Sequence, residues 1–163
     1  SIIHLMRGQL FDIDGTTFFT FGGARSHDIQ GGVLERDDPE FKTKAKRNSD
    51  SCIPYRINHE SWWKEEMPSI EERMEGWKNM EYIRNVDFII SHDCPTSILG
   101  CLDYGFCLYT PDELNDFFEE VNQNFGFRKW YFGHYHLNQD ITNKFTCLYS
   151  GIDLIRDKDA FHF

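Results

Sequence analysis

Val-Asp-Phe-Ile-Ile-Ser-His-Asp at residues 86–93 and Trp-Tyr-Phe-Gly-His-Tyr-His at residues 130–136 are the stretches that decide the fold of this 163-residue chain. Each begins with a β-branched or aromatic run that is typical of a buried strand, and each run leads into a histidine. Histidines that follow strands lie in loops at the strands' carboxyl ends, where open α/β sheets bind their ligands. The sequence therefore predicts a ligand site at this edge of a sheet.

The other segments predict an α/β fold with a mixed sheet and helices packed on it. Ser69 and Glu72 have the spacing of a capping box, and Thr110 followed by Pro111 predicts a second helix with Thr110 as its N-cap. In chain order the predicted elements are a hairpin (Gly8–Ile13 and Thr16–Phe21), a helix (Ser69 to about Ile83), a strand (Val86–Ile90), a helix (from Thr110) and three strands (Arg128–Phe132, Phe145–Tyr149 and Ile152–Ile155).

Between the hairpin and the first helix, residues 31–51 are polar and show no lasting apolar period. The basic cluster Lys42–Arg47 in this stretch is interpreted as a solvated loop or short helix face rather than as an anion site. The chain has the length of one domain, so a single domain over residues 1–163 is expected. Fifteen phenylalanines among 16% aromatic residues indicate a core built from large rings.

The formal net charge of −10 disfavours, on electrostatic grounds, binding of this chain to nucleic acid through the phosphate backbone, because both carry negative charge. No stripe of lysine and arginine offsets this charge. A phosphate-containing substrate remains compatible with it only where a bound divalent cation reverses the local sign.

The cysteines do not indicate a disulfide scaffold or a zinc ribbon, because there are five of them and no Cys-x-x-Cys pair. Reduced thiols in a cytoplasmic protein are expected instead. The sequence also has no run of about 18 apolar residues and no signal-peptide pattern, so no membrane association is expected.

His134 and His136 are the strongest candidate metal ligands. Neutral imidazole is the commonest metal-ligating side chain, and Gly133 lets the backbone approach an ion closely. His92 joins them as a candidate because two neighbouring parallel strands would bring both loops to one edge. Asp93 is interpreted as a ligand, as a partner that orients an imidazole, or as a turn residue.

The other histidines have weaker support. His27 and Asp28 follow a Gly-Gly turn and either face the same cleft or belong to a polar loop. His4, His59 and His162 are expected to be structural or surface residues.

Three imidazoles without a clear carboxylate partner are too few donors for a hydrolytic centre. Two divalent ions about 3.5–4 Å apart normally need several carboxylates as well. The missing ligands are therefore expected from outside these 163 residues.

Two motifs of the chain resemble the last two motifs of the calcineurin-like metallophosphoesterases. They are Ser91-His92 after the strand at 86–90, followed by Pro95, and Gly133-His134-Tyr135-His136 after the next strand. The stretches at residues 22–28 (Gly-Gly-Ala-Arg-Ser-His-Asp) and 62–68 (Trp-Trp-Lys-Glu-Glu-Met-Pro) are similar to a bacterial or phage-type branch of that family.

The resemblance implies the second half of a four-layer α/β sandwich and a phosphatase or phosphodiesterase that uses two divalent ions, manganese, iron or zinc. By resemblance, His92 and His134 would ligate one ion and His136 the other. A hydroxide activated by the metal would attack the phosphoester. The resemblance assigns no catalytic side chain and no substrate-binding residue in this chain.

The early motifs of that family (Asp-x-His, Gly-Asp-x-x-Asp and Gly-Asn-His-Asp/Glu) are absent from this sequence. The chain is therefore expected to correspond to the carboxy-terminal half and to be inactive or nearly so alone. The resemblance further implies an exposed apolar, aromatic-rich face, to be covered by an amino-terminal half or a second copy.

Two alternative functions remain open. One is a non-catalytic metal-binding or regulatory module from a split or degenerate gene. The other, which is weaker, is a zinc hydrolase with one ion on three histidines and with Asp93 or Asp28 as general base.

Overall fold

The computed structural model describes residues 3–102 and 109–155 of the chain. The chain divides into two compact units, one formed by Ser1–Gly23 with Pro68–Phe163 and the other by Ala24–Met67. Cys107, one of the five cysteines expected to be reduced, and His162, expected to be a structural or surface residue, lie outside the described residues.

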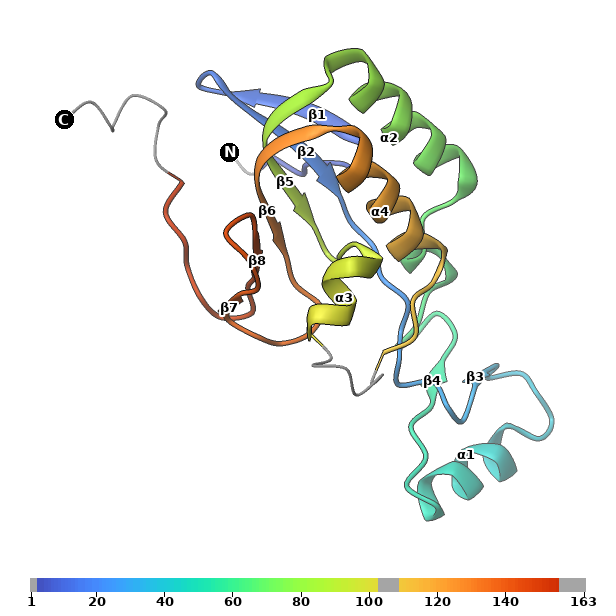
Figure 1. Cartoon of the computed structure of the whole chain (residues 1–163). Helices are drawn as coiled ribbons and strands as arrows, with labels where there is room; N and C mark the ends of the chain where they lie inside the picture. Colours follow the sequence, from blue (N-terminus) through green and yellow to red (C-terminus); the bar gives the residue numbers. More distant parts are fainter. Residues whose placement is uncertain (1–2, 103–108, 156–163) are drawn as a thin grey trace. The chain divides into compact units, whose positions relative to one another are not determined.

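The first unit contains a mixed six-stranded sheet, as Figure 1 shows. Its strands in spatial order are β1 (Gln9–Ile13), β2 (Thr16–Phe21), β5 (Asn85–Ser91), β6 (Gly126–Phe132), β8 (Phe145–Cys147) and β7 (Gln139–Asp140). The four central strands run parallel, and β1 and β7 pair antiparallel at the two edges. The predicted α/β fold with a mixed sheet and packed helices is confirmed, and so is the hairpin around Asp14-Gly15.

Three helices belong to this unit: α2 (Ile70–Ile83), α3 (Thr96–Leu102) and α4 (Glu113–Asn124). Helix α2 begins where the sequence predicts, because the Ser69 hydroxyl accepts from the Glu72 N–H at 3.2 Å and the Glu72 carboxylate accepts from the Ser69 N–H at 2.9 Å. It ends at Arg84, whose backbone is left-handed with φ 63°.

The predicted start of the next helix at Thr110 is wrong, because α4 takes Asp112 as its N-cap. The Asp112 carboxylate accepts from the N–H groups of Leu114 (2.8 Å) and Asn115 (3.3 Å), and the Asn115 side chain accepts from the Asp112 N–H at 3.0 Å. A carboxylate with two N–H groups in reach is a stronger cap than the threonine two residues earlier, so Pro111 lies before the helix.

The main core lies between the sheet and helices α2 and α4. Phe19, Ile89 and Trp130 share one register position on neighbouring strands and are fully buried. The Phe118 ring of α4 meets the Trp130 ring edge-on at 5.5 Å. A Cβ at Gly76 of α2 would lie 2.8 Å from the Phe21 ring, so only glycine allows this close helix–sheet contact.

The opposite face of the sheet carries a second aromatic cluster of Phe18, Phe88 and Tyr131. Residues of the same chain cover these rings, because Arg128 and Lys129 lie over the rings of Phe88 and Tyr131 and the Tyr131 hydroxyl donates to Asp153 at 2.8 Å. The expected exposed aromatic face is therefore buried in part by the chain itself. Apolar side chains that stay exposed include Ile13, Ile90, Ile152 and Leu154.

The predicted strand at 152–155 is not formed, and the strand predicted at 145–149 ends at Cys147. The side-chain oxygen of Asn138 accepts from the N–H groups of Tyr149 (3.0 Å), Ser150 (3.1 Å) and Gly151 (2.7 Å). Because these donors bond to one side chain, the backbone turns there and does not extend the ladder of β8.

The second unit combines a short parallel pair, β3 (Val33–Leu34) and β4 (Arg56–Ile57), with helix α1 (Phe41–Asp50) and a 3-10 turn at Lys64–Glu66. Asn48 is buried on α1 and donates to the Gly31 carbonyl at 2.9 Å. The predicted polar stretch thus contains a helix held by local polar contacts. In the described part of the chain, no helix is long and apolar enough to cross a bilayer.

Candidate metal centre

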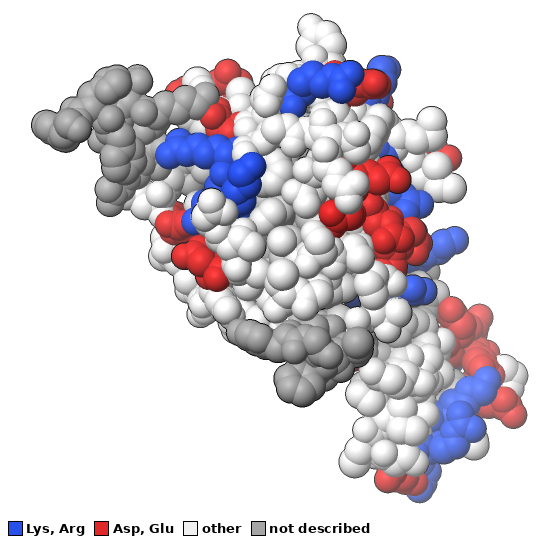
Figure 2. Space-filling model, viewed as in Figure 1, with Lys and Arg blue, Asp and Glu red and all other residues white. Residues whose placement is uncertain are grey.

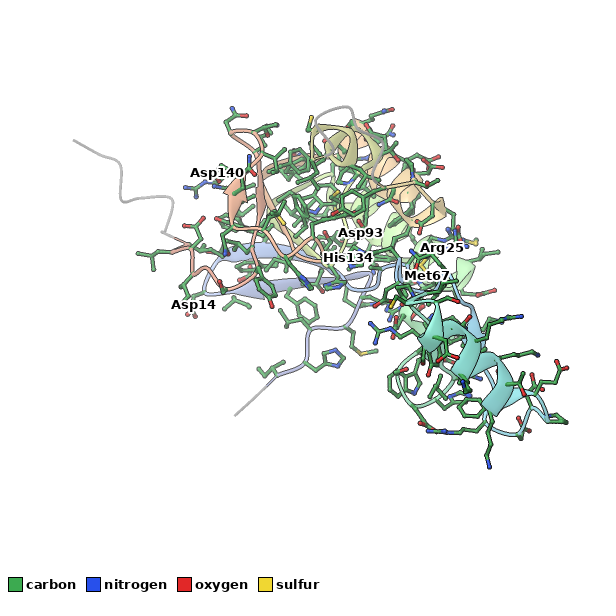
Figure 3. All side chains as sticks on the ribbon, turned by 90° about the horizontal axis from the view of Figure 1, so that it is seen from below. Asp14, Arg25, Met67, Asp93, His134 and Asp140 are labelled. Carbon is green, nitrogen blue, oxygen red and sulfur yellow. The ribbon has the colours of Figure 1, made fainter. Side chains whose placement is uncertain are left out.

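His92 and His134 lie side by side at the carboxyl ends of β5 and β6. The two strands are parallel neighbours and end at the same edge, since Ile90 pairs with Tyr131. The Gly133 N–H donates to the His92 carbonyl at 3.1 Å and joins the two loops. The ring centroids of His92 and His134 are 5.2 Å apart with an interplanar angle of 67°. Figure 3 shows His134 beside Asp93 at this edge.

The loop after β6 has an unusual backbone. His134 and His136 both adopt left-handed conformations, with φ of 63° and 54°. A non-glycine residue in this region costs about 1–2 kcal/mol, so the surrounding structure must hold it there. A Cβ at Gly133 would stand 3.5 Å from Nδ1 of His92, so a larger side chain there would lie against the imidazole.

His136 has a different neighbour from the other two histidines. Its ring packs on the Tyr149 ring, with centroids 4.5 Å apart and an interplanar angle of 36°. Within residues 3–102 and 109–155, no group of three or more His, Cys, Asp or Glu side chains is arranged to hold a metal ion. The structure therefore brings together two of the three predicted ligands and places the third against a tyrosine.

Two imidazoles at this separation suit one tetrahedral ion. With metal–nitrogen bonds of about 2.0–2.1 Å, two imidazoles on the same tetrahedral ion have ring centroids about 5 Å apart. The observed 5.2 Å agrees with that value, and it is also an ordinary centroid distance for two rings in edge-on contact. Imidazole donors fit zinc or iron, whereas manganese prefers carboxylate and water oxygens. Two neutral ligands also leave the charge of a divalent cation without a carboxylate partner.

The Asp93 side chain is buried, with 3% of its surface exposed. Its Oδ1 accepts hydrogen bonds from the Tyr135 hydroxyl, the Cys94 N–H (2.7 Å) and the Asn115 amide (3.0 Å). Burial raises the pKa of the Asp93 carboxyl, while these donors favour its charged form. Of the three roles considered for Asp93, the bond from the Cys94 N–H fits that of a turn residue. Its other two bonds tie its loop to α4 and to the loop after β6.

Tyr135 and Asn115 are polar residues of the site that the sequence did not single out. Burial raises the pKa of the Tyr135 hydroxyl, as it does that of the Cys94 thiol beside it, so both groups keep their protons at neutral pH. The sequence did contain a signal for Tyr135, because it lies between the candidate ligands His134 and His136. Asn115 had none, since its link to Asp93 spans 22 residues.

Asp28 is engaged inside the second unit. The Arg56 guanidinium donates to both of its carboxylate oxygens, one of them from Nε at 3.0 Å. The hydrogen bond and charge of Arg56 hold the pKa of the Asp28 carboxyl below its usual range. An arginine-paired carboxylate is a poor proton acceptor, which weakens the case for Asp28 as a general base.

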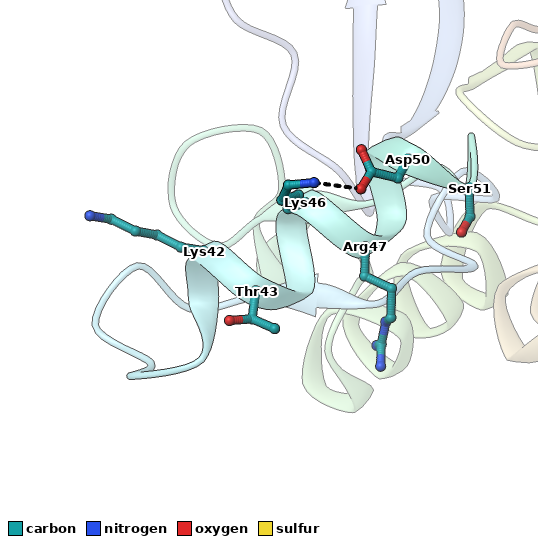
Figure 4. Close-up of a pocket in the computed structure, with 6 residues that line it drawn as sticks. All are labelled: Lys42, Thr43, Lys46, Arg47, Asp50 and Ser51. Carbon is teal, nitrogen blue, oxygen red and sulfur yellow. Dashed lines mark hydrogen bonds and ion pairs between the residues drawn. The ribbon is translucent and has the colours of Figure 1, made fainter.

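Two charged surfaces lie elsewhere on the described residues. A hollow of about 470 Å³ along α1 is lined by Lys42, Thr43, Lys46, Arg47, Asp50 and Ser51, as Figure 4 shows. Lys46 is neutralised there by Asp50 at 2.8 Å, in keeping with a solvated helix face. Acidic side chains gather over α4 in Figure 2, where Glu113, Asp116 and Glu120 are exposed.

Comparison with known proteins found no relative of this chain. No protein-family model, no curated protein sequence and no solved structure matches the chain. The interpretation of the site therefore depends on its own geometry and chemistry.

Proposed function

We propose that this chain supplies histidine ligands to the metal centre of a phosphoester hydrolase of the calcineurin-like metallophosphoesterase type, and that the 163 residues alone have little activity. The observation that supports the proposal is the 5.2 Å separation of the His92 and His134 rings at the ends of two parallel strands. The positions of both histidines match the family motifs that the sequence resembles.

In this proposal His92 and His134 hold one divalent ion and His136 belongs to the second. When bound, such ions lower the pKa of a coordinated water and polarise phosphoryl oxygens, which is the chemistry that phosphoester hydrolysis needs. The chain's own residues orient the ligands. The hydrogen bond from Gly133 N–H to the His92 carbonyl fixes the two loops, and the Tyr149 ring restricts the His136 ring.

The remaining ligands come from polypeptide outside these residues, either an amino-terminal half or a second copy. Ile13, Ile90, Ile152 and Leu154 are apolar and exposed, and they are suited to such a contact. A cytoplasmic location and two divalent ions, manganese, iron or zinc, are part of the same proposal. The net charge of −10 supports a small phosphoester over nucleic acid held by its backbone.

A non-catalytic metal-binding or regulatory module is the second candidate. It requires one ion at most, for which His92 and His134 supply two ligands at the ends of β5 and β6. In-frame Asp-x-His and Asn-His-Asp/Glu motifs in the coding DNA upstream of Ser1 would favour the hydrolase, and a start codon at that position would favour the module.

Metal content and hydrolysis test the proposal. We expect the purified chain to bind Mn²⁺ or Zn²⁺ and to lose that binding in His92→Ala and His134→Ala, as measured by equilibrium dialysis with elemental analysis. His4→Ala is the control, because His4 is exposed. Hydrolysis of p-nitrophenyl phosphate and of its diester should stay near background for the chain alone. Unchanged metal binding in both site variants would show that the proposed function is wrong.

A further inference from the structure

A buried polar cluster lies directly behind the two histidines. Asp93 follows His92 in the chain, and Tyr135 follows His134. While each histidine lies at the sheet edge, the residue after it is turned inward, and Asp93 and Tyr135 are both buried. The two imidazole rings lie 5.2 Å apart, and the Asp93 carboxylate and the Tyr135 hydroxyl are hydrogen-bonded to each other. The Tyr135 ring also meets the His134 ring edge-on, with centroids 5.0 Å apart.

One carboxylate oxygen joins three segments of the chain. Oδ1 of Asp93 accepts from the Tyr135 hydroxyl in the loop after β6, from the Cys94 N–H in its own loop, and from the Asn115 amide in the first turn of α4. The Asn115 amide also donates to the Cys94 carbonyl at 2.9 Å. We call Asp93, Tyr135 and Asn115 the Asp93 cluster.

Helix α4 anchors this cluster. The side-chain oxygen of Asn115 accepts from the Asp112 N–H at 3.0 Å, within the capping box that begins the helix. Both polar ends of the Asn115 amide are thus bonded, which fixes the orientation of the side chain. The fixed Asn115 amide therefore holds the Asp93 carboxylate in place from helix α4, which lies outside the two loops.

The loop that carries His134 needs such a support. His134 has φ 63°, and the Tyr135 N–H donates to the Gly133 carbonyl at 2.7 Å, which makes a tight turn. A non-glycine residue in this conformation persists only when its surroundings hold it. The Tyr135 side chain is held at its hydroxyl by Asp93 and at its ring by Phe132 and Tyr109, with centroids at 6.1 Å and 4.9 Å.

We propose that the Asp93 cluster is a positioning device that sets the separation of the His92 and His134 rings by fixing the backbone of both loops. The geometric part of this inference does not depend on the proposed function, whereas its consequence for metal binding does. Asp93, Tyr135 and Asn115 are positioning residues. Asp93 and Asn115 act on the ligands through the backbone of the loops, and Tyr135 acts both through the backbone and through its edge-on ring contact with His134 at 5.0 Å.

The test compares variants that remove one hydroxyl bonded to a buried carboxylate. Tyr135→Phe removes the bond to Asp93. Thr17→Val removes the 2.8 Å bond from Thr17 to Asp87, which is buried near the start of β5, and serves as the matched control. Asp93→Ala removes the acceptor, and Asp93→Asn keeps an oxygen in its place.

The first measurement needs no metal. In the metal-free chain with ¹³C-labelled histidine, an NOE between the His92 and His134 rings is expected in the wild type, in Thr17→Val and in Asp93→Asn. It should weaken or vanish in Tyr135→Phe and Asp93→Ala. An NOE that persists in both of those, or one that is also lost in Thr17→Val, would overturn the proposal. Tyr135→Phe decides the question if Asp93→Ala does not fold.

The second measurement is Co²⁺ affinity from the visible absorption of the bound ion. We expect Tyr135→Phe to weaken binding about tenfold or more, as is typical when residues that orient metal ligands are removed, and Thr17→Val to leave it unchanged. Equal affinity in wild type and Tyr135→Phe would refute the effect on the metal. If the wild type binds no Co²⁺, the proposed function fails while the NOE still tests the cluster.

Discussion

At the scale of single residues, the backbone at Arg84 carries conformational strain at the end of a helix. This residue follows α2 with φ 63°, a conformation that glycine adopts without strain. We expect Arg84→Gly to raise the free energy of unfolding by about 1 kcal/mol, measured by urea denaturation, because relief of the left-handed strain exceeds the extra entropy of glycine in the unfolded chain.

Arg84→Ala is the control for this prediction. Both variants lose the exposed 3.7 Å ion pair with Glu81, which contributes little, but only glycine relieves the backbone. Equal stability of the two variants would show that the backbone at Arg84 is not strained.

The residues of the site differ in how far sequence alone could place them. His92 and His134 were predictable, because each follows a run typical of a parallel strand and such strands end at one edge. The contacts of Asp93 were not, since they join it to residues 22 and 42 positions away through the register of the sheet. His136 depends on the course of the chain after β8, which no local pattern indicated.

At the scale of elements, the start of α4 depends on Asp112. Asp112→Ala removes the acceptor for two N–H groups and should lower the free energy of unfolding by about 1–2 kcal/mol in urea denaturation. Asp112→Asn keeps a capping oxygen and should lose much less. If both variants lose the same free energy of unfolding, Asp112 does not stabilise the protein by capping α4.

The same residue should give the stability a dependence on pH. Burial raises the pKa of the Asp112 carboxyl in the folded protein above its ordinary 3.8. The folded state then binds more protons than the unfolded state between those two values, so stability falls as pH rises through the folded pKa and is level above it. In urea titrations across this range, Asp112→Asn should gain stability relative to wild type as pH rises. A constant difference would contradict the raised pKa.

The capping box of α2 was visible in the sequence, whereas the N-cap of α4 was placed two residues too early. For Lys42–Arg47 the sequence left a loop and a short helix face open. The structure shows helix α1 there, and its buried residue is Asn48, which donates to a carbonyl 17 residues away. Helix α3 has only seven residues and no cap signal, and the burial of Ile98, Leu99 and Leu102 explains its stability.

At the scale of the whole molecule, the division into two compact units predicts that the first unit keeps its fold without the second. All six strands of the main sheet, and the whole Asp93 cluster, belong to the unit formed by residues 1–23 and 68–163. If the sheet supports the histidines without help, replacing residues 24–67 by a flexible Gly-Ser linker of about ten residues should leave the near-ultraviolet circular dichroism of Trp130 and its aromatic neighbours largely intact.

The readout that matters for function is the pair of histidines. In the shortened chain the NOE between the His92 and His134 rings should remain, since β5, β6 and α4 are all retained. The matched control is the same linker inserted after Gly23, at the boundary of the two units, with no deletion, which tests the linker itself. Loss of the NOE in the shortened chain, with the control unaffected, would show that residues 24–67 help to shape the site. The site would then be a property of both units together.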